Sequence, residues 1–217
     1  MQIGVCRMKG QNEIKTLVAG HLLDIGAVFF RPEEPFTWAS GIKSPVYCDN
    51  RLILTSTESR NDVEQAIADT VKREYPQAEA LFGTSTAGIA HAAIAAHVLG
   101  LPMGYVRGSS KDHGRNNRIE GRLEKGQKVV VVEDLISTAG SAVQTVEALR
   151  EAGAEVLGIV SIFTYGMEKG LRRMEEAGVR NVSLSDFNTA AEMALERGLV
   201  DKNGYEQLMK FIEENGR

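Results

Sequence analysis

The sequence predicts an α/β fold in which a central, mostly parallel β-sheet is flanked by helices. Apolar strand-like segments alternate with amphipathic helical segments along residues 57–165, and this alternation is typical of parallel sheets with right-handed crossovers. Residues 129–132 are four consecutive valines, as expected for a strand buried on both faces. With 217 residues, 43% of them hydrophobic, the chain can bury one sizeable core. We therefore expect a single domain over residues 1–217.

The elements follow from hydrophobic spacing, taken in chain order. Residues 12–28 have apolar side chains at helical spacing, which predicts an amphipathic first helix. A polar, proline-interrupted segment then breaks the alternation up to about residue 55, and we expect residues 1–55 to cap the edge of the sheet. The core, residues 56–217, is predicted to contain helices at 57–75, 89–100, 142–153, 168–177, 188–197 and 204–214, and strands within 78–88, 103–107, 129–134 and 155–165.

Composition excludes several classes of protein. The net charge of −4 argues against general nucleic-acid binding. No apolar run approaches the roughly 20 residues needed to cross a membrane, and the first 16 residues lack the apolar core of a signal peptide. The two cysteines, Cys6 and Cys48, are expected to be reduced thiols, and no Cys/His spacing suggests a zinc site. We expect a cytoplasmic protein that binds neither nucleic acid nor membranes.

Residues 107–128 form a basic segment within this acidic chain. They are glycine-rich and poor in apolar residues, which predicts a mobile loop between two strands. A solvated surface loop is the simplest interpretation, but its place just before an acidic strand end favours an anionic ligand. The segment has seven basic residues against three acidic ones: Arg107, Lys111, Arg115, Arg118, Arg122, Lys125 and Lys128, against Asp112, Glu120 and Glu124.

The valine strand runs into Glu133 and Asp134 and then into a turn of small residues, 137–141, that opens a helix. The chain has neither a G-x-x-x-x-G-K-[ST] motif nor a G-x-G-x-x-G motif after a strand. Backbone N–H groups of such a turn can bind phosphate with help from the helix dipole, and its three hydroxyls add donors. A simple capped helix is the alternative interpretation of the turn alone.

The acidic pair makes the phosphate interpretation more specific. A carboxylate beside a phosphate repels it, so the acidic pair is expected to bind another group. A carboxylate can accept two hydrogen bonds from a cis-diol, or hold Mg²⁺ through the water shell of the ion. Together, Glu133, Asp134 and the small-residue turn predict a ribose 5-phosphate site.

These motifs carry a family resemblance. Residues 129–141 resemble the phosphoribosyl diphosphate (PRPP) signature of type I phosphoribosyltransferases. Residues 36–51 and 105–114 are similar to the base-binding segment and the mobile catalytic loop of the orotate phosphoribosyltransferase family, and the resemblance extends at least over residues 12–163. It implies the type I phosphoribosyltransferase fold, with a small N-terminal hood at about residues 1–55. The PRPP-binding core and the C-terminal helices would then occupy residues 56–217.

The resemblance also assigns roles to residues. Lys111, His113 and Asp134 are expected to be catalytic, and orotate is expected to contact Ser137, Lys43 and Tyr47. PRPP is expected to bind to three segments, comprising Thr84, Ser85 and Thr86; Arg107, Lys111 and His113; and Glu133, Asp134, Leu135, Ile136, Ser137, Thr138, Ala139, Gly140 and Ser141.

The implied activity is Mg²⁺-dependent transfer of ribose 5-phosphate from PRPP to orotate, giving orotidine 5′-monophosphate and diphosphate in pyrimidine (UMP) biosynthesis. Mg²⁺ is expected to be carried by PRPP, with no direct protein ligand and a water-mediated contact to Asp134. The family resemblance further implies a homodimer whose active sites are shared across the interface. Ala39, Ala87, Gly108 and Tyr165 stand where some members carry lysine or arginine, which leaves the residue that binds the orotate carboxylate open.

Two alternative functions remain at this point. One is a purine phosphoribosyltransferase, against which the segment at residues 36–45 argues. The other is a regulator that binds PRPP without catalysis. The presence of both acidic residues and of the Lys111/His113 pair favours an enzyme.

Overall fold

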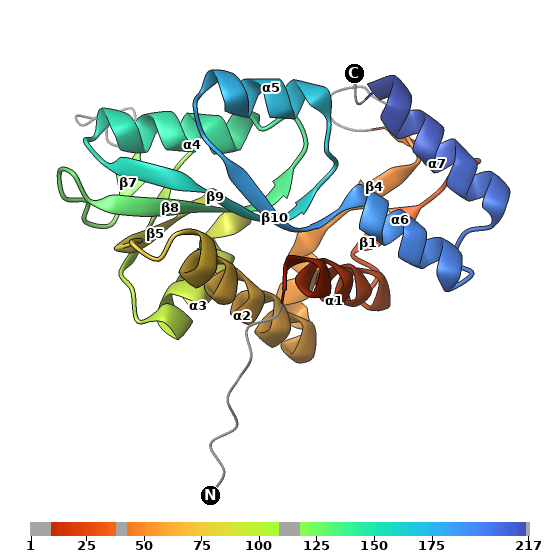
Figure 1. The fold of residues 1–217 in the computed structure, drawn as a ribbon, viewed down its shortest axis with the longest axis horizontal. Coiled ribbons are helices and arrows are strands. Elements are labelled where there is room, and N and C mark those ends of the chain that lie inside the picture. The colour runs from red at the N-terminus through yellow and green to blue at the C-terminus, as the bar shows by residue number, and fades with distance from the viewer. Residues whose placement is uncertain (1–9, 38–42, 109–117, 216–217) are drawn as a thin grey trace, which may run out of the picture.

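The computed structural model describes residues 10–37, 43–108 and 118–215. Within these ranges the chain forms a six-stranded, mostly parallel sheet with helices on both faces, together with two short antiparallel ribbons (Figure 1). In Figure 1, α4 and α5 lie above the sheet, and α1, α2 and α3 lie below it. The predicted α/β fold class is confirmed.

The element bounds are as follows. The helices are α1 Gln11–Asp24, α2 Thr57–Glu74, α3 Gly88–Leu99, α4 Gly140–Glu151, α5 Glu168–Glu176, α6 Phe187–Glu196 and α7 Lys202–Asn215, with a 3₁₀ helix η1 at Asn50–Thr55. The strands are β1 Val28–Phe30, β2 Phe36–Thr37, β3 Lys43–Ser44, β4 Val46–Cys48, β5 Ala80–Thr84, β6 Met103–Val106, β7 Ile119–Glu120, β8 Lys128–Ile136, β9 Glu155–Thr164 and β10 Asn181–Asp186.

The strand order of the main sheet is β10-β9-β8-β5-β6-β7, and β7 alone runs antiparallel to its neighbour. The chain leaves β5 in one direction, through α3 to β6. It leaves the adjacent strand β8 in the other direction, through α4 to β9. The order therefore reverses between β5 and β8, and open α/β sheets bind ligands at the carboxyl ends of the strands at such a point.

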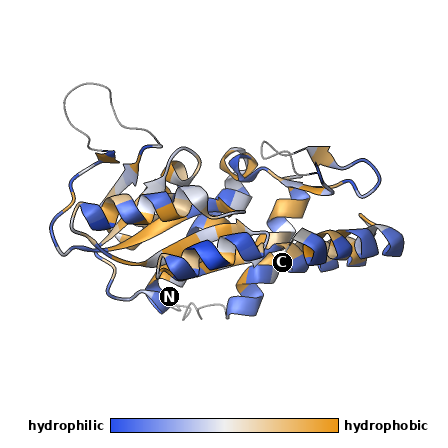
Figure 2. Ribbon diagram, turned by 90° about the horizontal axis from the view of Figure 1, so that it is seen from above, coloured by the Kyte–Doolittle hydropathy of each residue, from blue (hydrophilic) through white to orange (hydrophobic). Residues whose placement is uncertain are grey.

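The valines of β8 pack into both layers of the core. Val130 and Val132 contribute to a cluster with α1, α2 and α3, whereas Val129 and Val131 contribute to a cluster with α4. All four side chains are fully buried. Figure 2 shows the strands as a hydrophobic layer between helices whose outer faces are hydrophilic. A strand covered on both faces explains why this segment reads as a continuous apolar run.

The first helix and the edge strand β10 differ from the sequence prediction. The first helix ends at Asp24 rather than at residue 28, because Gly26 takes a left-handed φ of +65° and Val28 enters β1 opposite Cys48. Strand β10, which the apolar pattern did not predict, pairs in parallel with β9 at the sheet edge. Helix α1 packs on β10 and α6, so it contacts the core as well as the ribbon β1–β4.

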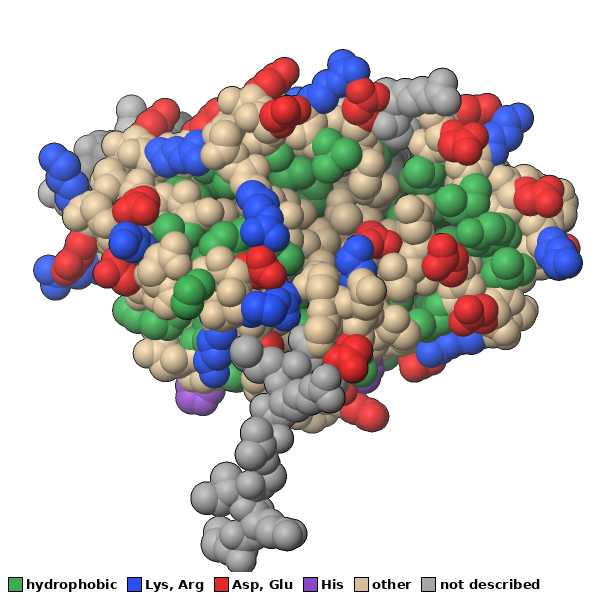
Figure 3. Space-filling view, in the orientation of Figure 1, with side chains coloured by type: hydrophobic (Ala, Val, Ile, Leu, Met, Phe, Trp, Pro, Cys, Tyr) green, Lys and Arg blue, Asp and Glu red, His purple; other side chains and the backbone are tan. Residues whose placement is uncertain are grey.

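The surface carries charges of both signs. On the face drawn in Figure 3, Lys and Arg side chains are interspersed with Asp and Glu side chains. This mixture agrees with the small net charge of −4. Among the described residues, no helix combines the length and the apolar character that crossing a membrane requires.

Candidate active site

The predicted site lies where the carboxyl ends of β5, β6 and β8 meet. These strands are parallel neighbours, so the turns at residues 85–87 and 137–139 and the start of the basic segment at Arg107 emerge from one edge of the sheet. The structure thereby brings together the described parts of all three predicted PRPP segments. Lys111 and His113 lie outside the described residues.

The turn after β5 is fixed by two glycines. A Cβ atom on Gly83 would come within 2.7 Å of the Gly88 carbonyl oxygen, and one on Gly88 would come within 2.5 Å of the Val132 oxygen. The start of α3 can therefore lie directly against β5 and β8. The Thr84 side chain is buried and donates to the Val132 oxygen at 3.3 Å, which leaves the half-buried Ser85 and the exposed Thr86 as the accessible hydroxyls of this turn.

Glu133 and Asp134 lie near the carboxyl end of β8, which continues to Ile136. The Glu133 carboxyl is buried; it accepts from the Ser141 hydroxyl at 3.0 Å and from the Asp134 backbone N–H at 3.1 Å. Burial, reinforced by a hydrogen bond with Asp134 and by its negative charge, raises the pKa of Glu133 to about 8. Near neutral pH Glu133 is thus mostly protonated, which relieves the repulsion expected between adjacent carboxylates.

This raised pKa predicts a pH-dependent stability. Between the ordinary carboxyl range and about pH 8 the folded state binds a proton that the unfolded state has lost, so the free energy of unfolding falls as pH rises. Glu133→Gln removes the titration and should raise the midpoint of thermal unfolding by roughly 10 °C at pH 9, and by little near pH 5. Calorimetry of unfolding across this range measures the difference. Glu147→Gln, on the exposed face of α4, is the control. If the unfolding midpoint of Glu133→Gln changed with pH in the same way as that of wild type, the raised pKa of Glu133 would be contradicted.

The small-residue turn forms a concave row of donors at the start of α4. Ala139 takes a left-handed φ of +57°, and α4 begins at the next residue. Within the described ranges, the backbone N–H groups of Thr138, Ala139, Gly140 and Ser141 donate to no protein acceptor. Of the two other residues predicted here, Leu135 is half-buried and Ile136 is buried. Successive free amides at a helix N-terminus suit a phosphate group.

A chain of hydrogen bonds ties the N-terminal segment to this edge. The Asn50 side chain donates to the Asp134 carbonyl oxygen at 2.6 Å, and the Cys48 thiol donates to Asn50 Oδ1 at 3.2 Å. The Cys48 backbone N–H donates to the Tyr165 hydroxyl at 3.0 Å. The Tyr165 side chain that accepts this bond is buried, and burial raises the pKa of Tyr165 above its ordinary value. The bond from the Cys48 N–H to this buried hydroxyl holds the N-terminal segment in place. Sequence reasoning missed Asn50, whose buried amide gives no periodic signal.

Two of the three predicted orotate contacts, Lys43 and Tyr47, lie on the antiparallel ribbons that precede Asn50 in the chain. Lys43 is exposed in β3, and Tyr47 is 39% exposed in β4, where it pairs with Phe29. The Tyr47 ring also packs against Phe36, with centroids 5.7 Å apart. Both side chains are thus accessible on the segment that Asn50 anchors, whereas Ser137 lies in the turn after β8. Their contact with orotate stays a prediction.

The base of the basic loop is a short hairpin between β6 and β7. The Arg107 backbone N–H donates to the Arg118 oxygen at 2.8 Å, and Arg118 Nε donates to the Arg107 oxygen at 2.9 Å. Arg107 Nε lies 3.2 Å from Glu120 Oε1. This closed base holds both ends of the segment that carries Lys111 and His113 beside the turn after β5.

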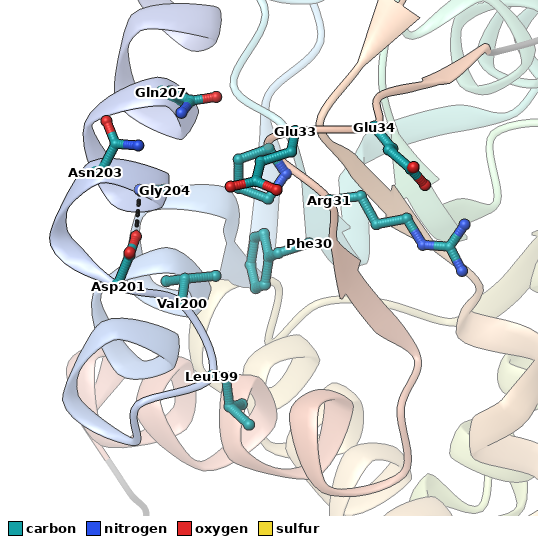
Figure 4. Close-up of a pocket in the computed structure, with 11 residues that line it drawn as sticks. Phe30, Arg31, Glu33, Glu34, Leu199, Val200, Asp201, Asn203, Gly204 and Gln207 are labelled. Carbon is teal, nitrogen blue, oxygen red and sulfur yellow. Dashed lines mark hydrogen bonds between the residues drawn. The ribbon is translucent and has the colours of Figure 1, made fainter.

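A separate pocket of about 520 Å³ lies between the β1–β2 connection and α7 (Figure 4). Its lining includes the carboxylates of Glu33, Glu34 and Asp201 and the cation Arg31. Asp201 accepts from the Gly204 backbone N–H at 2.7 Å, the dashed contact in Figure 4. Because carboxylates outnumber cations in its lining, this pocket suits neither PRPP nor orotate, which are both anions.

Comparison with known proteins decides between the interpretations of this edge. The phosphoribosyl transferase domain model matches residues 53–196. Orotate phosphoribosyltransferases of Bacillus cereus and Bacillus anthracis are each 53% identical over 198 residues, covering 91% of this chain and 94% of the relative. The chain belongs to the orotate phosphoribosyltransferase family. The recognition made from the PRPP signature is thereby confirmed.

Solved structures agree with this family. The orotate phosphoribosyltransferase of Aeropyrum pernix superposes with a TM-score of 0.73 at 31% identity, covering 85% of this chain and 99% of that one. UMP synthase of Leishmania donovani gives a TM-score of 0.78 at 24% identity, covering 92% of this chain and 42% of that one, which bears on the fold alone. The type I phosphoribosyltransferase fold predicted from the sequence is confirmed.

Proposed function

We propose that the chain transfers the ribose 5-phosphate group of PRPP to orotate, releasing diphosphate, as a glycosyltransferase of pyrimidine biosynthesis. The observation that carries the proposal is the row of N–H groups at residues 138–141 that find no acceptor among the described residues, beside the Glu133–Asp134 pair, at the point where the strand order reverses. The 53% identity to orotate phosphoribosyltransferases supports orotate as the acceptor and weighs against a purine base or a purely regulatory role.

In the proposed reaction a ring nitrogen of orotate attacks the anomeric carbon as the bond to diphosphate breaks, with inversion at that carbon. Positive charge develops on the ribose and negative charge on the leaving diphosphate. The partly exposed Asp134 carboxylate would hold the ribose hydroxyls and favour the cationic ring, whereas the buried and mostly protonated Glu133 would add little charge. Arg107, Lys111 and His113 would stabilise the diphosphate, and closure of their loop would exclude water from the cation.

Mg²⁺ fits this site as a companion of PRPP. No cluster of three or more His, Cys, Asp or Glu side chains that could hold a metal occurs among the residues that the structure describes. The Asp134 carboxylate is partly exposed at the strand end, which suits a water-mediated contact to a cation held mainly by ligand oxygens. When bound, Mg²⁺ supplies charge neutralisation for the diphosphate. The shared-site homodimer and the cytoplasmic location remain parts of this proposal.

The test is a substrate panel. With PRPP and Mg²⁺ present, the absorbance change of orotate should report turnover, whereas adenine, guanine and hypoxanthine should give none. Turnover of a purine base with no turnover of orotate would establish the alternative enzyme. Binding of PRPP without turnover of any base would establish the regulator.

Arg51 is the residue that we propose for the orotate carboxylate. Tyr165 is buried against Cys48, and position 39 is alanine, so neither supplies a cation. Arg51 Nε and Nη2 donate to both oxygens of Asp49 at 2.6 and 2.8 Å, which fixes the guanidinium while leaving the side chain 66% exposed. Asp49, and to a smaller extent the charges of Tyr47 and Asp134, raise the pKa of Arg51 above its ordinary value. The donors of Arg51 that Asp49 does not use would then be available to the orotate carboxylate.

Replacing Arg51 should separate the two substrates. Arg51→Gln is expected to raise the KM of orotate about tenfold, the loss expected for one charge-assisted hydrogen bond, with the KM of PRPP little changed. Steady-state kinetics with each substrate varied in turn measures both constants. Arg197→Gln is the matched control, because that arginine likewise donates to a carboxylate, Asp24 Oδ1 at 2.6 Å, but lies after α6 and outside the candidate site. An unchanged KM for orotate in Arg51→Gln would remove Arg51 from the site.

A further inference from the structure

Helix α5 packs directly behind the phosphate-binding turn. Arg173 Nη1 donates to the Thr138 carbonyl oxygen at 2.9 Å. A Cβ atom on Gly170 would come within 2.5 Å of the Ser137 carbonyl oxygen. Gly170 and Arg173 are three residues apart and so lie on one face of the helix. That face therefore contacts the carbonyl side of two successive peptide groups of the turn.

These contacts determine which way the amides point. In a trans peptide the C=O and N–H groups point in opposite directions. The Ser137–Thr138 and Thr138–Ala139 peptides are trans, and both of their carbonyls are turned toward α5. The N–H groups of Thr138 and Ala139 consequently face away from α5, and neither they nor the first amides of α4 have a protein acceptor among the described residues. Such a run of amides is an anion-binding concavity.

The turn needs an external restraint to keep this shape. Ala139 holds a left-handed φ of +57°, which is unfavourable for a residue with a Cβ atom. Gly140 makes room for the restraint, since a Cβ atom there would come within 2.9 Å of Arg173 Nη1. Two glycines thus allow α5 and its guanidinium to reach the turn from behind. The Arg173 charge lies on the same side as the carbonyls and offsets their negative ends.

We propose that α5 preorganises the phosphate cradle, with Arg173 as the positioning residue that holds the amides of Thr138 and Ala139 toward the 5′-phosphate of PRPP. The inference rests on the proposed function, in which residues 137–141 bind that phosphate. Arg173 acts through the backbone of the turn, from behind it, and touches no substrate. Its loss should therefore weaken binding of the phosphate end of PRPP and leave the base end unaffected.

The experiment compares Arg173→Ala, Arg173→Lys and Arg172→Ala. Arg172 is on the same helix but is exposed and paired with Glu168, so it serves as the matched control. Calorimetry with PRPP, and separately with ribose 5-phosphate, gives affinities, and kinetics gives the two KM values. Arg173→Ala should weaken both affinities about tenfold and raise the KM of PRPP, with the KM of orotate unchanged. Arg173→Lys should recover most of the loss, and Arg172→Ala should match wild type.

The outcomes separate the two proposals. If wild type binds neither PRPP nor ribose 5-phosphate, the proposed function fails. If wild type binds them and Arg173→Ala binds them equally well, the preorganisation proposal fails. Should Arg173→Ala not fold, Gly170→Ala tests the same contact between α5 and the turn, because its new methyl group displaces the Ser137 carbonyl. A folded Gly170→Ala variant with wild-type PRPP affinity would overturn the inference.

Discussion

Lys111→Ala should lower turnover by roughly 10²- to 10³-fold, the range seen when one preorganised charge-stabilising group is removed from an active site. The effect on PRPP affinity should be smaller, because a loop that closes during the reaction contributes mainly to the transition state. Steady-state kinetics at saturating orotate and PRPP measures the first effect, and calorimetry with PRPP measures the second.

Lys125→Ala is the control for this variant. Lys125 belongs to the same basic segment but is exposed in the turn before β8, outside the expected catalytic loop. Its loss should leave turnover within a factor of about two of wild type, as expected for a surface substitution. Near-normal turnover in Lys111→Ala would exclude Lys111 from the mechanism.

Mixing two inactive variants should restore activity if the active site is shared between subunits. The loop rises from the β6–β7 hairpin, and a loop of this length can extend beyond its own domain. In a mixed dimer of Lys111→Ala and Asp134→Ala chains, one site collects both substitutions and the other has neither. Random exchange makes about half of the dimers mixed, so activity should recover to roughly a quarter of wild type.

Native mass spectrometry can confirm that subunits have exchanged before the assay is read. Each variant incubated alone provides the baseline and should stay inactive. Confirmed exchange without recovery of activity would mean that the loop serves the site of its own chain, and the shared-site proposal would be wrong.

Most of the fold could be predicted because its central elements have strong local signals. The four valines of β8 and the helical spacing of α4 fix a buried strand and its crossover helix. Strand β10 was missed although Asn181–Asp186 alternates polar and apolar side chains, because the segment has only six residues and two apolar ones, Val182 and Leu184. The end of α1 was misplaced because Val28 continues the apolar spacing, and only the left-handed φ of Gly26 separates it from the helix.

The site was predictable where it follows from strand ends. Parallel strands share a carboxyl edge, so the turns after β5 and β8 had to meet once the alternation was known. The contacts that support the turn were not predictable in this way. Asn50 and Asp134 are 84 residues apart, and Arg173 and Thr138 are 35 apart. Such pairs depend on tertiary packing. Asn50 and Arg173 are polar, so the spacing of apolar residues gives no information about their partners.

The central claim is that the amides of residues 138–141 bind the 5′-phosphate of PRPP, and amide NMR of the protein during a PRPP titration tests it most directly. With Mg²⁺ present, the backbone amide signals of Thr138, Ala139, Gly140 and Ser141 should shift most, and ribose 5-phosphate should shift the same signals. Residues that line the separate pocket beside α7 should stay unchanged. Saturable PRPP shifts confined to that pocket or another surface, with the four amides unmoved, would contradict the account.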